Sequence, residues 1–172
     1  MAAHNLVIVH VDDELHLVEQ MPDQIRLQFN LLHPHLDTGE LIDEEAADWV
    51  EGRAISAFTV KWPDGTAFRI EYQLLAEMPN PEWGEVVLAI FDYLTMNNSE
   101  MQPLSTDKVR EIVRSLGADN VFVFTGYPDP AMDLKDIVAD GNFIVKPGDS
   151  VAMTAQLVAR LVVAMNRIRN CE

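Results

Sequence analysis

Four segments that are apolar at almost every position constrain the fold of this chain more than any other feature of its sequence. They are residues 6–11, 86–91, 121–124 and 143–145, rich in Val, Ile and Phe. A segment that is apolar at nearly every position has no polar face to turn toward water, so it predicts a strand buried on both faces of a sheet. Helical patterns separate these segments, and strands that alternate with helices predict an α/β protein with a parallel sheet.

Apolar residues spaced three and four apart predict the helices. The first predicted helix is residues 22–32, opened by Pro22, with Met21, Ile25, Phe29 and Leu32 on one side. A second begins at Ser105 or Thr106 and ends at Gly117, and a third spans residues 131–140. Ser150 is expected to cap a last helix, whose core stripe is Leu157, Leu161, Met165 and Ile168.

Residues 33–85 follow a different pattern. Residues 43–50 predict a short helix closed by Gly52, with an acidic first turn that suits the helix dipole. Apolar and polar residues then alternate over 58–62 and 68–74, on either side of Pro63-Asp64-Gly65, which predicts a β-hairpin. All three tryptophans of the chain fall in this region, and a satellite core is favoured for them over an exposed partner surface: Trp49, Trp62 and Trp83.

The composition narrows the class of protein. The chain has 28 acidic and 12 basic residues, a net charge of −16, which argues against direct nucleic-acid binding. A single cysteine, Cys171, excludes a disulfide framework and favours a reducing cytoplasm. No signal-peptide pattern is evident, and no apolar run is expected to cross a membrane, so a soluble cytoplasmic protein is predicted.

Polar residues follow each buried segment: Asp12 and Asp13, Asp92, Thr125 and Lys146. The carboxyl ends of parallel strands meet at one edge of a sheet, where ligands bind, so these side chains are expected to converge. Clustered carboxylates repel one another, and a bound cation relieves that repulsion. Sites made only of oxygen ligands suit Mg²⁺. A lone carboxylate at the end of a central strand is also a candidate nucleophile that forms an aspartyl phosphate, so Asp92 is the leading candidate.

The motifs VIVHVDDE, VVLAIFDYL, VFVFTGY and FIVKPGD, in this order, resemble the receiver domain of two-component response regulators. The resemblance covers residues 5–32 and 86–169. It implies a flavodoxin-like, doubly wound sheet of five parallel strands in the order 2-1-3-4-5, within a single receiver domain of residues 1–172. Residues 33–85 would be an atypical insertion, a short helix plus a hairpin, of which one strand serves as the second strand of the sheet.

The resemblance also implies a role for each motif residue. Asp92 would be the phosphoacceptor, with Thr125 and Lys146 contacting the phosphoryl group. The Mg²⁺ ligands would be Asp13, Asp92 and the backbone carbonyl of Leu94, with Asp12 acting largely through water. Phe143 would be a switch aromatic.

The resemblance predicts a signalling protein rather than an enzyme. A histidine kinase or phosphotransfer protein would supply the phosphoryl group, and output would pass to a downstream effector through protein–protein contact. A homodimer through the last helices is a further expectation. Two departures from the family are visible: the long interval between Asp13 and Asp92, and the absence of a Met-Pro pair after the acceptor, where this chain has residues 94–97 as LTMN.

Two rival functions remain open at this point. The first is a degenerate receiver that acts as an interaction module without being phosphorylated, against which the complete set of motif residues argues. The second is a Mg²⁺-dependent phosphohydrolase with an aspartyl nucleophile, which commonly needs a second Asp where this chain has Leu94. His10 falls inside a buried segment and is interpreted as a hydrogen-bonded core histidine rather than a phosphodonor.

Overall fold

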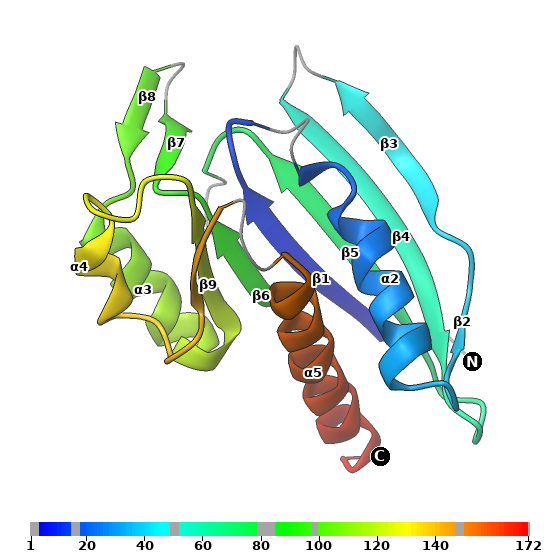
Figure 1. Ribbon diagram of the computed structural model, residues 1–172. Helices are drawn as coiled ribbons and strands as arrows, with labels where there is room; N and C mark the ends of the chain where they lie inside the picture. Colours follow the sequence, from blue (N-terminus) through cyan, green and yellow to red (C-terminus); the bar gives the residue numbers. More distant parts are fainter. Residues whose placement is uncertain are drawn as a thin grey trace.

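A mixed β-sheet is the centre of the fold (Figure 1). The computed structural model describes residues 4–14, 18–48, 52–78, 85–97, 100–146 and 150–171. Five strands pair in parallel: β1 (His4–Val11), β5 (Ala67–Leu75), β6 (Val86–Phe91), β9 (Val121–Thr125) and β10 (Phe143–Val145). They lie in the spatial order β10-β9-β6-β1-β5. The predicted α/β class with a largely parallel sheet is therefore confirmed.

Antiparallel strands extend the sheet beyond β5. β4 (Arg53–Lys61) pairs with β5, and both β2 (Asp37–Thr38) and β3 (Ile42–Asp48) pair with β4. Within the described residues the main sheet thus has eight strands, and its number and order of strands differ from the predicted five-stranded sheet. The difference arises because β2, β3 and β4 add antiparallel strands beyond β5, where β3 replaces part of a predicted helix.

The short helix predicted from residues 43–50 is wrong, because residues 42–48 form β3. Pairing with β4 stabilises the strand: Ile42 lies opposite Ala57, and Asp43 lies opposite Ser56, whose hydroxyl donates to the Asp43 carboxylate over 2.8 Å. These contacts are distant in the sequence, so they override the local helical preference of an acidic segment.

The predicted hairpin is confirmed, with β4 and β5 as its two strands. Gly65 adopts a φ of +90° in the turn, a conformation that glycine reaches without strain. The Asp64 carboxylate accepts a hydrogen bond from the Thr66 N–H over 2.9 Å and fixes the turn. β5 pairs with β1 from His4–Phe68 to Val11–Leu75, so one strand of the hairpin lies beside the first strand, as expected.

Helices cover the two faces of the sheet in pairs. α2 (Met21–Leu32) and α5 (Ser150–Arg169) lie side by side on one face, and α3 (Thr106–Leu116) and α4 (Met132–Lys135) lie on the other (Figure 1). Leu6 and Ile8 of β1 face the first pair, and Val7, Val9 and Val11 face the second. β1 is consequently buried on both faces, which explains its unbroken apolar sequence.

Several predicted helices need correction. α2 buries Met21, Ile25 and Phe29 but leaves Leu32 46% exposed, so Leu32 is not part of its apolar stripe. α4 is a single turn, Met132–Lys135, rather than a helix over residues 131–140, and residues 118–120 form a 3-10 turn, η1 (Ala118–Asn120).

The predicted limits of α3 are confirmed. Ser105 occupies the N-cap position, and Gly117 ends the helix with a φ of +87°. In α5, Leu157, Leu161 and Met165 are fully buried, as predicted. Ile168 is partly buried against the same core. The side chain of Ser150 lies outside the described part of the structure.

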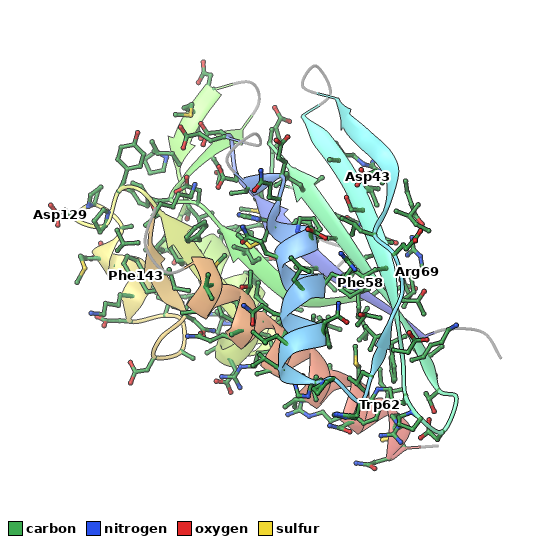
Figure 2. The ribbon with its side chains drawn as sticks, turned by 45° about the vertical axis from the view of Figure 1, so that its right-hand side comes forward. Asp43, Phe58, Trp62, Arg69, Asp129 and Phe143 are labelled. Carbon is green, nitrogen blue, oxygen red and sulfur yellow. The ribbon has the colours of Figure 1, made fainter. Side chains whose placement is uncertain are left out.

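Trp62 joins the main core rather than a satellite core. It packs against the cluster beneath α2 and α5, and the Arg169 guanidinium lies 4.0 Å from the centroid of its ring. Arg169 also pairs with Asp64, so the end of α5 contacts the hairpin turn, where Figure 2 shows Trp62. Trp49 and Trp83 lie outside the described residues.

One described helix meets the length and composition of a membrane span. Residues Val151–Arg169 of α5 are long and apolar enough, contrary to the expectation from the sequence. Met153, Leu157 and Leu161 are nevertheless completely buried against the sheet, and α2 packs beside them. A core helix of a globular protein passes the same test of length and hydropathy.

Candidate functional site

The carboxyl ends of three parallel strands bring Asp12, Asp92 and Lys146 together. The Asp12 N–H donates to the Leu75 carbonyl over 2.9 Å, and the Asp92 N–H donates to the Val11 carbonyl over 2.9 Å. The Lys146 N–H donates to the Thr125 carbonyl over 2.8 Å. These bonds extend the ladder of the parallel sheet one residue past each strand, so they fix the backbone from which each side chain projects.

The ammonium group of Lys146 lies between the two carboxylates. Its Nζ is 2.5 Å from Oδ2 of Asp12 and 2.8 Å from Oδ2 of Asp92. The exposed fractions are 10% for the lysine side chain, 0% for Asp12 and 2% for Asp92. Three charged groups have therefore left water together, which is favourable only because the ammonium lies at hydrogen-bonding distance from both carboxylates and offsets part of their charge.

The pKa values of this group reflect that balance. Burial raises the pKa of Asp12, but the nearby His10 and the hydrogen-bonded, positively charged Lys146 outweigh it, and the net pKa lies below the ordinary value. For Lys146, burial lowers the pKa, and the hydrogen bonds to Asp12 and Asp92 outweigh it, so the net pKa is raised. The site therefore holds the ammonium and the Asp12 carboxylate in their charged forms.

An acidic cluster at this edge of the sheet could hold a metal ion. Asp12, Glu14 and Asp92 each offer a carboxylate oxygen, and these oxygens lie within 4.8 Å of one another. A donor set made only of oxygens suits a hard divalent cation. The Glu14 N–H donates to Oδ1 of Asp12 over 2.9 Å, which turns the chain so that both carboxylates face the same place.

Glu14 was not predicted as a site residue, although it is the third acid of the DDE motif. Asp13, which was predicted as a direct ligand, is not part of this group of three. Burial raises the pKa of Asp13, and the negative charges of Asp12 and Asp92 raise it further, so its carboxyl lies within their electrostatic reach.

The remaining predicted residues occupy the same edge or the strands that lead to it. Thr125 is fully buried at the end of β9, opposite Val145, and its hydroxyl oxygen accepts a hydrogen bond from the Tyr127 N–H over 3.0 Å. Phe143 is half-buried and packs on the core beneath α3 and α4. Figure 2 labels it on the left of the view.

A second hairpin, which the sequence did not predict, begins two residues after Asp92. Its strands are β7 (Leu94–Asn97) and β8 (Glu100–Pro103), and together they form a separate two-stranded sheet. The Asp92 carboxylate accepts a hydrogen bond from the Tyr93 N–H over 2.5 Å, and the Leu104 N–H donates to the Tyr93 carbonyl over 2.6 Å. Leu94, the predicted carbonyl ligand, is thus the first residue of this hairpin.

Two buried aromatic residues lie directly behind Asp12. His10 is fully buried, and its Nδ1 lies 2.5 Å from the Tyr72 hydroxyl. Its Nε2 lies 3.6 Å from Oδ2 of Asp12 and has no hydrogen-bond partner. Burial lowers the pKa of His10 and raises that of Tyr72 well above its ordinary value, so both rings are neutral at pH 7. The interpretation of His10 as a hydrogen-bonded core histidine is confirmed.

Comparison with protein families and with curated proteins identifies no relative of this chain. The sequence matches no protein-family model, and no curated protein is significantly similar to it. The fold and the site together define an α/β protein with a mostly parallel sheet and an acidic cluster, at the carboxyl edge of that sheet, which could hold a metal ion.

Proposed function

We propose that this chain is a response-regulator receiver that accepts a phosphoryl group on Asp92, with Mg²⁺, from a histidine kinase or phosphotransfer protein. One observation carries the proposal: Lys146 bridges Asp12 and Asp92 at the ends of three different strands. If Lys146 were only a surface lysine and Asp12 only a helix cap, the two side chains would have no reason to meet. This convergence is the arrangement that the resemblance to receivers implies for these residues.

The topology of the parallel strands supports the proposal. Considered apart from the antiparallel strands, they lie in the order β5-β1-β6-β9-β10. Ranked along the chain, this order of the parallel strands alone is second, first, third, fourth, fifth, and its likeness to the order that the resemblance implies supports the proposal. β2, β3 and β4 are additions at one edge, and they come from the region between residues 33 and 85.

The chemistry requires little beyond alignment and charge neutralisation. An oxygen of Asp92 attacks the phosphorus of a phosphohistidine, the P–N bond breaks, and the departing imidazole keeps the electron pair and takes up a proton. An acyl phosphate on Asp92 results. Lys146, already hydrogen-bonded to Asp92, neutralises the incoming phosphoryl oxygens, and the Thr125 hydroxyl donates to one of them.

The donor set of the acidic cluster fits Mg²⁺. Asp12, Glu14 and Asp92 would hold the ion, and the resemblance adds Asp13 and the carbonyl of Leu94 as further ligands. When bound, Mg²⁺ supplies positive charge that lowers the repulsion between an anionic carboxylate and an anionic phosphoryl group.

The output of such a receiver passes through protein–protein contact in the cytoplasm. Phosphorylation would shift an equilibrium between two surface conformations, and a downstream effector would bind one of them. Phe143 is the proposed switch, because it is half-buried on β10, the strand that leads directly into Lys146. A homodimer through α5 remains part of the proposal.

Acetyl phosphate provides a direct test. The purified chain is incubated with acetyl phosphate and Mg²⁺, and its intact mass is measured. We expect a mass increase of one phosphoryl group in the wild type and none in Asp92→Asn. Asp107→Asn is the matched control, because it makes the same change at an exposed site on α3 and should label like the wild type.

Two results would contradict the proposal. Equal labelling of Asp92→Asn and the wild type would show that Asp92 is not the acceptor. No labelling of the folded wild type, by acetyl phosphate or by a phosphorylated phosphotransfer protein, would favour the interaction module that is never phosphorylated. Steady turnover of a phosphomonoester would instead favour a phosphohydrolase.

A further inference from the structure

The buried Nε2 of His10 needs an explanation. Nearly all buried polar groups in folded proteins have a hydrogen-bond partner, and the exceptions commonly have a role. Among the described residues, three buried side-chain nitrogens lack a partner, and His10 Nε2 is the one at the acidic cluster. It points to Oδ2 of Asp12 at 3.6 Å, slightly beyond the length of a hydrogen bond.

The surroundings of His10 determine which of its nitrogens carries the proton. If Nδ1 carried it, Nε2 would present a lone pair to a carboxylate, and the buried Tyr72 hydroxyl would lose its acceptor. If the Tyr72 hydroxyl donates to Nδ1 across 2.5 Å, Nε2 carries the proton and presents an N–H dipole to Asp12. The second arrangement satisfies both contacts, so it is the more stable one.

We propose that Tyr72 and His10 are positioning residues that orient the Asp12 carboxylate for cation binding. The Tyr72 hydroxyl holds the His10 ring in its Nε2–H form, and this N–H faces Asp12 from the side opposite the solvent. Lys146 reaches the same carboxylate from the end of β10, and the backbone N–H of Glu14 donates to it from the segment that follows β1. Outer partners of this kind orient metal ligands and strengthen binding in metal sites. The inference rests on the proposed role of Asp12 in holding a cation.

Tyr72 gives the inserted region a part in the site. It belongs to β5, the strand of the hairpin that pairs with β1 opposite Ile8. Tyr72 and His10 lie on the same face of neighbouring strands, beneath α2 and α5. Residues 33–85 are therefore more than an edge extension, because one of their side chains supports a ligand of the acidic cluster.

The first test measures the form of the His10 ring without metal or phosphodonor. Long-range ¹H–¹⁵N correlation spectra of the full chain, labelled with ¹⁵N-histidine and assigned with His10→Gln, distinguish the two tautomers. We expect the Nε2–H form in the wild type and a mixture of forms in Tyr72→Phe. A wild-type ring with its proton on Nδ1 would overturn the inference.

The second test measures the binding of Mg²⁺ alone by titration calorimetry. Tyr72→Phe and His10→Phe should each weaken binding by about tenfold. His10→Gln should retain most of the affinity, because its amide N–H can replace the Nε2–H. Phe68→Leu is the matched control, since Phe68 is equally buried on β5 and faces the same core but does not contact the cluster.

Each outcome has a definite meaning. If Tyr72→Phe binds Mg²⁺ like the wild type, or Phe68→Leu loses as much affinity as Tyr72→Phe, the effect is absent or merely structural and the inference is overturned. Should His10→Phe fail to fold, Tyr72→Phe still decides the question. Wild-type protein that binds no Mg²⁺ overturns the inference, whereas failure of acetyl phosphate labelling with Mg²⁺ binding intact overturns only the proposed receiver function.

Discussion

The two halves of the sheet bury their strands differently. Every residue of β9 is buried, and most residues of β1 and β6 are, because helices cover both faces there. In β5, buried and half-exposed residues alternate strictly, and only the face beneath α2 and α5 is deeply buried. The difference shows that an unbroken apolar run and an alternating one report how many faces of a strand are covered.

Each half also contains a basic side chain between two carboxylates. In the fully covered half, Lys146 lies between Asp12 and Asp92, with exposed fractions of 10%, 0% and 2%. In the other half, Arg69 contacts Glu44 and Glu71, with exposed fractions of 30%, 41% and 15%. Arg69 belongs to β5, and Figure 2 shows it on the opposite side of the view from Phe143. Burial therefore separates the two groups: the charges of the first have left water, whereas the second is a partly solvated contact.

Shortening a side chain should show the largest difference in stability between the two halves of the sheet. Ile90 is fully buried in β6, so Ile90→Ala should lower the free energy of unfolding by about 2–5 kcal/mol. Gln73→Ala, on the half-exposed face of β5, should change it by less than about 1 kcal/mol. Urea denaturation of both variants measures the difference. Equal losses would mean that the second face of β5 is covered as thoroughly as the first.

Lys146→Met should have the next largest effect on the free energy of unfolding. It leaves two buried carboxylates without their cation, so we expect a loss of about 3 kcal/mol at pH 7. The lowered pKa of Asp12 contributes stability above about pH 3.8, its ordinary value, and that contribution disappears as the pH falls through the folded-state pKa. The difference between variant and wild type should therefore shrink in acid. Denaturation at several pH values checks this, and a difference independent of pH would contradict it.

Arg69→Met should have the smallest effect. Its ion pairs with Glu44 and Glu71 are partly exposed, so the loss should be under about 1 kcal/mol at physiological salt and should diminish further at 1 M salt. Thermal unfolding at two salt concentrations is the measurement. A loss as large as that of Lys146→Met would remove the distinction between the two ion-pair groups.

Much of this architecture could be predicted from local patterns. Apolar runs located β1, β6 and β9, because near-complete burial leaves few polar positions in the sequence, and a shorter run located β10, where Ile144 alone is buried. The hairpin of β4 and β5 followed from alternation around Pro63-Asp64-Gly65. The convergence of Asp12, Asp92 and Lys146 followed from the common direction of parallel strands, a geometric rule that holds whatever the intervening sequence.

What could not be predicted depends on contacts between distant residues. β3 has a helix-like acidic sequence and is a strand because it pairs with β4. The β7–β8 hairpin is the exception: it is a local structure, and it was missed because its short strands show only weak alternation. No local motif links His10 to Tyr72, which lie 62 positions apart and meet only once β5 has docked on β1.

The contact between Arg169 and Trp62 gives the protein an intrinsic optical reporter. The guanidinium at the end of α5 lies over the indole beside the hairpin turn, and Asp64 pairs with the same guanidinium. Indole emission responds to a charge held above the ring. Movement of the last turn of α5 would therefore alter fluorescence that originates in the inserted hairpin, without any attached dye.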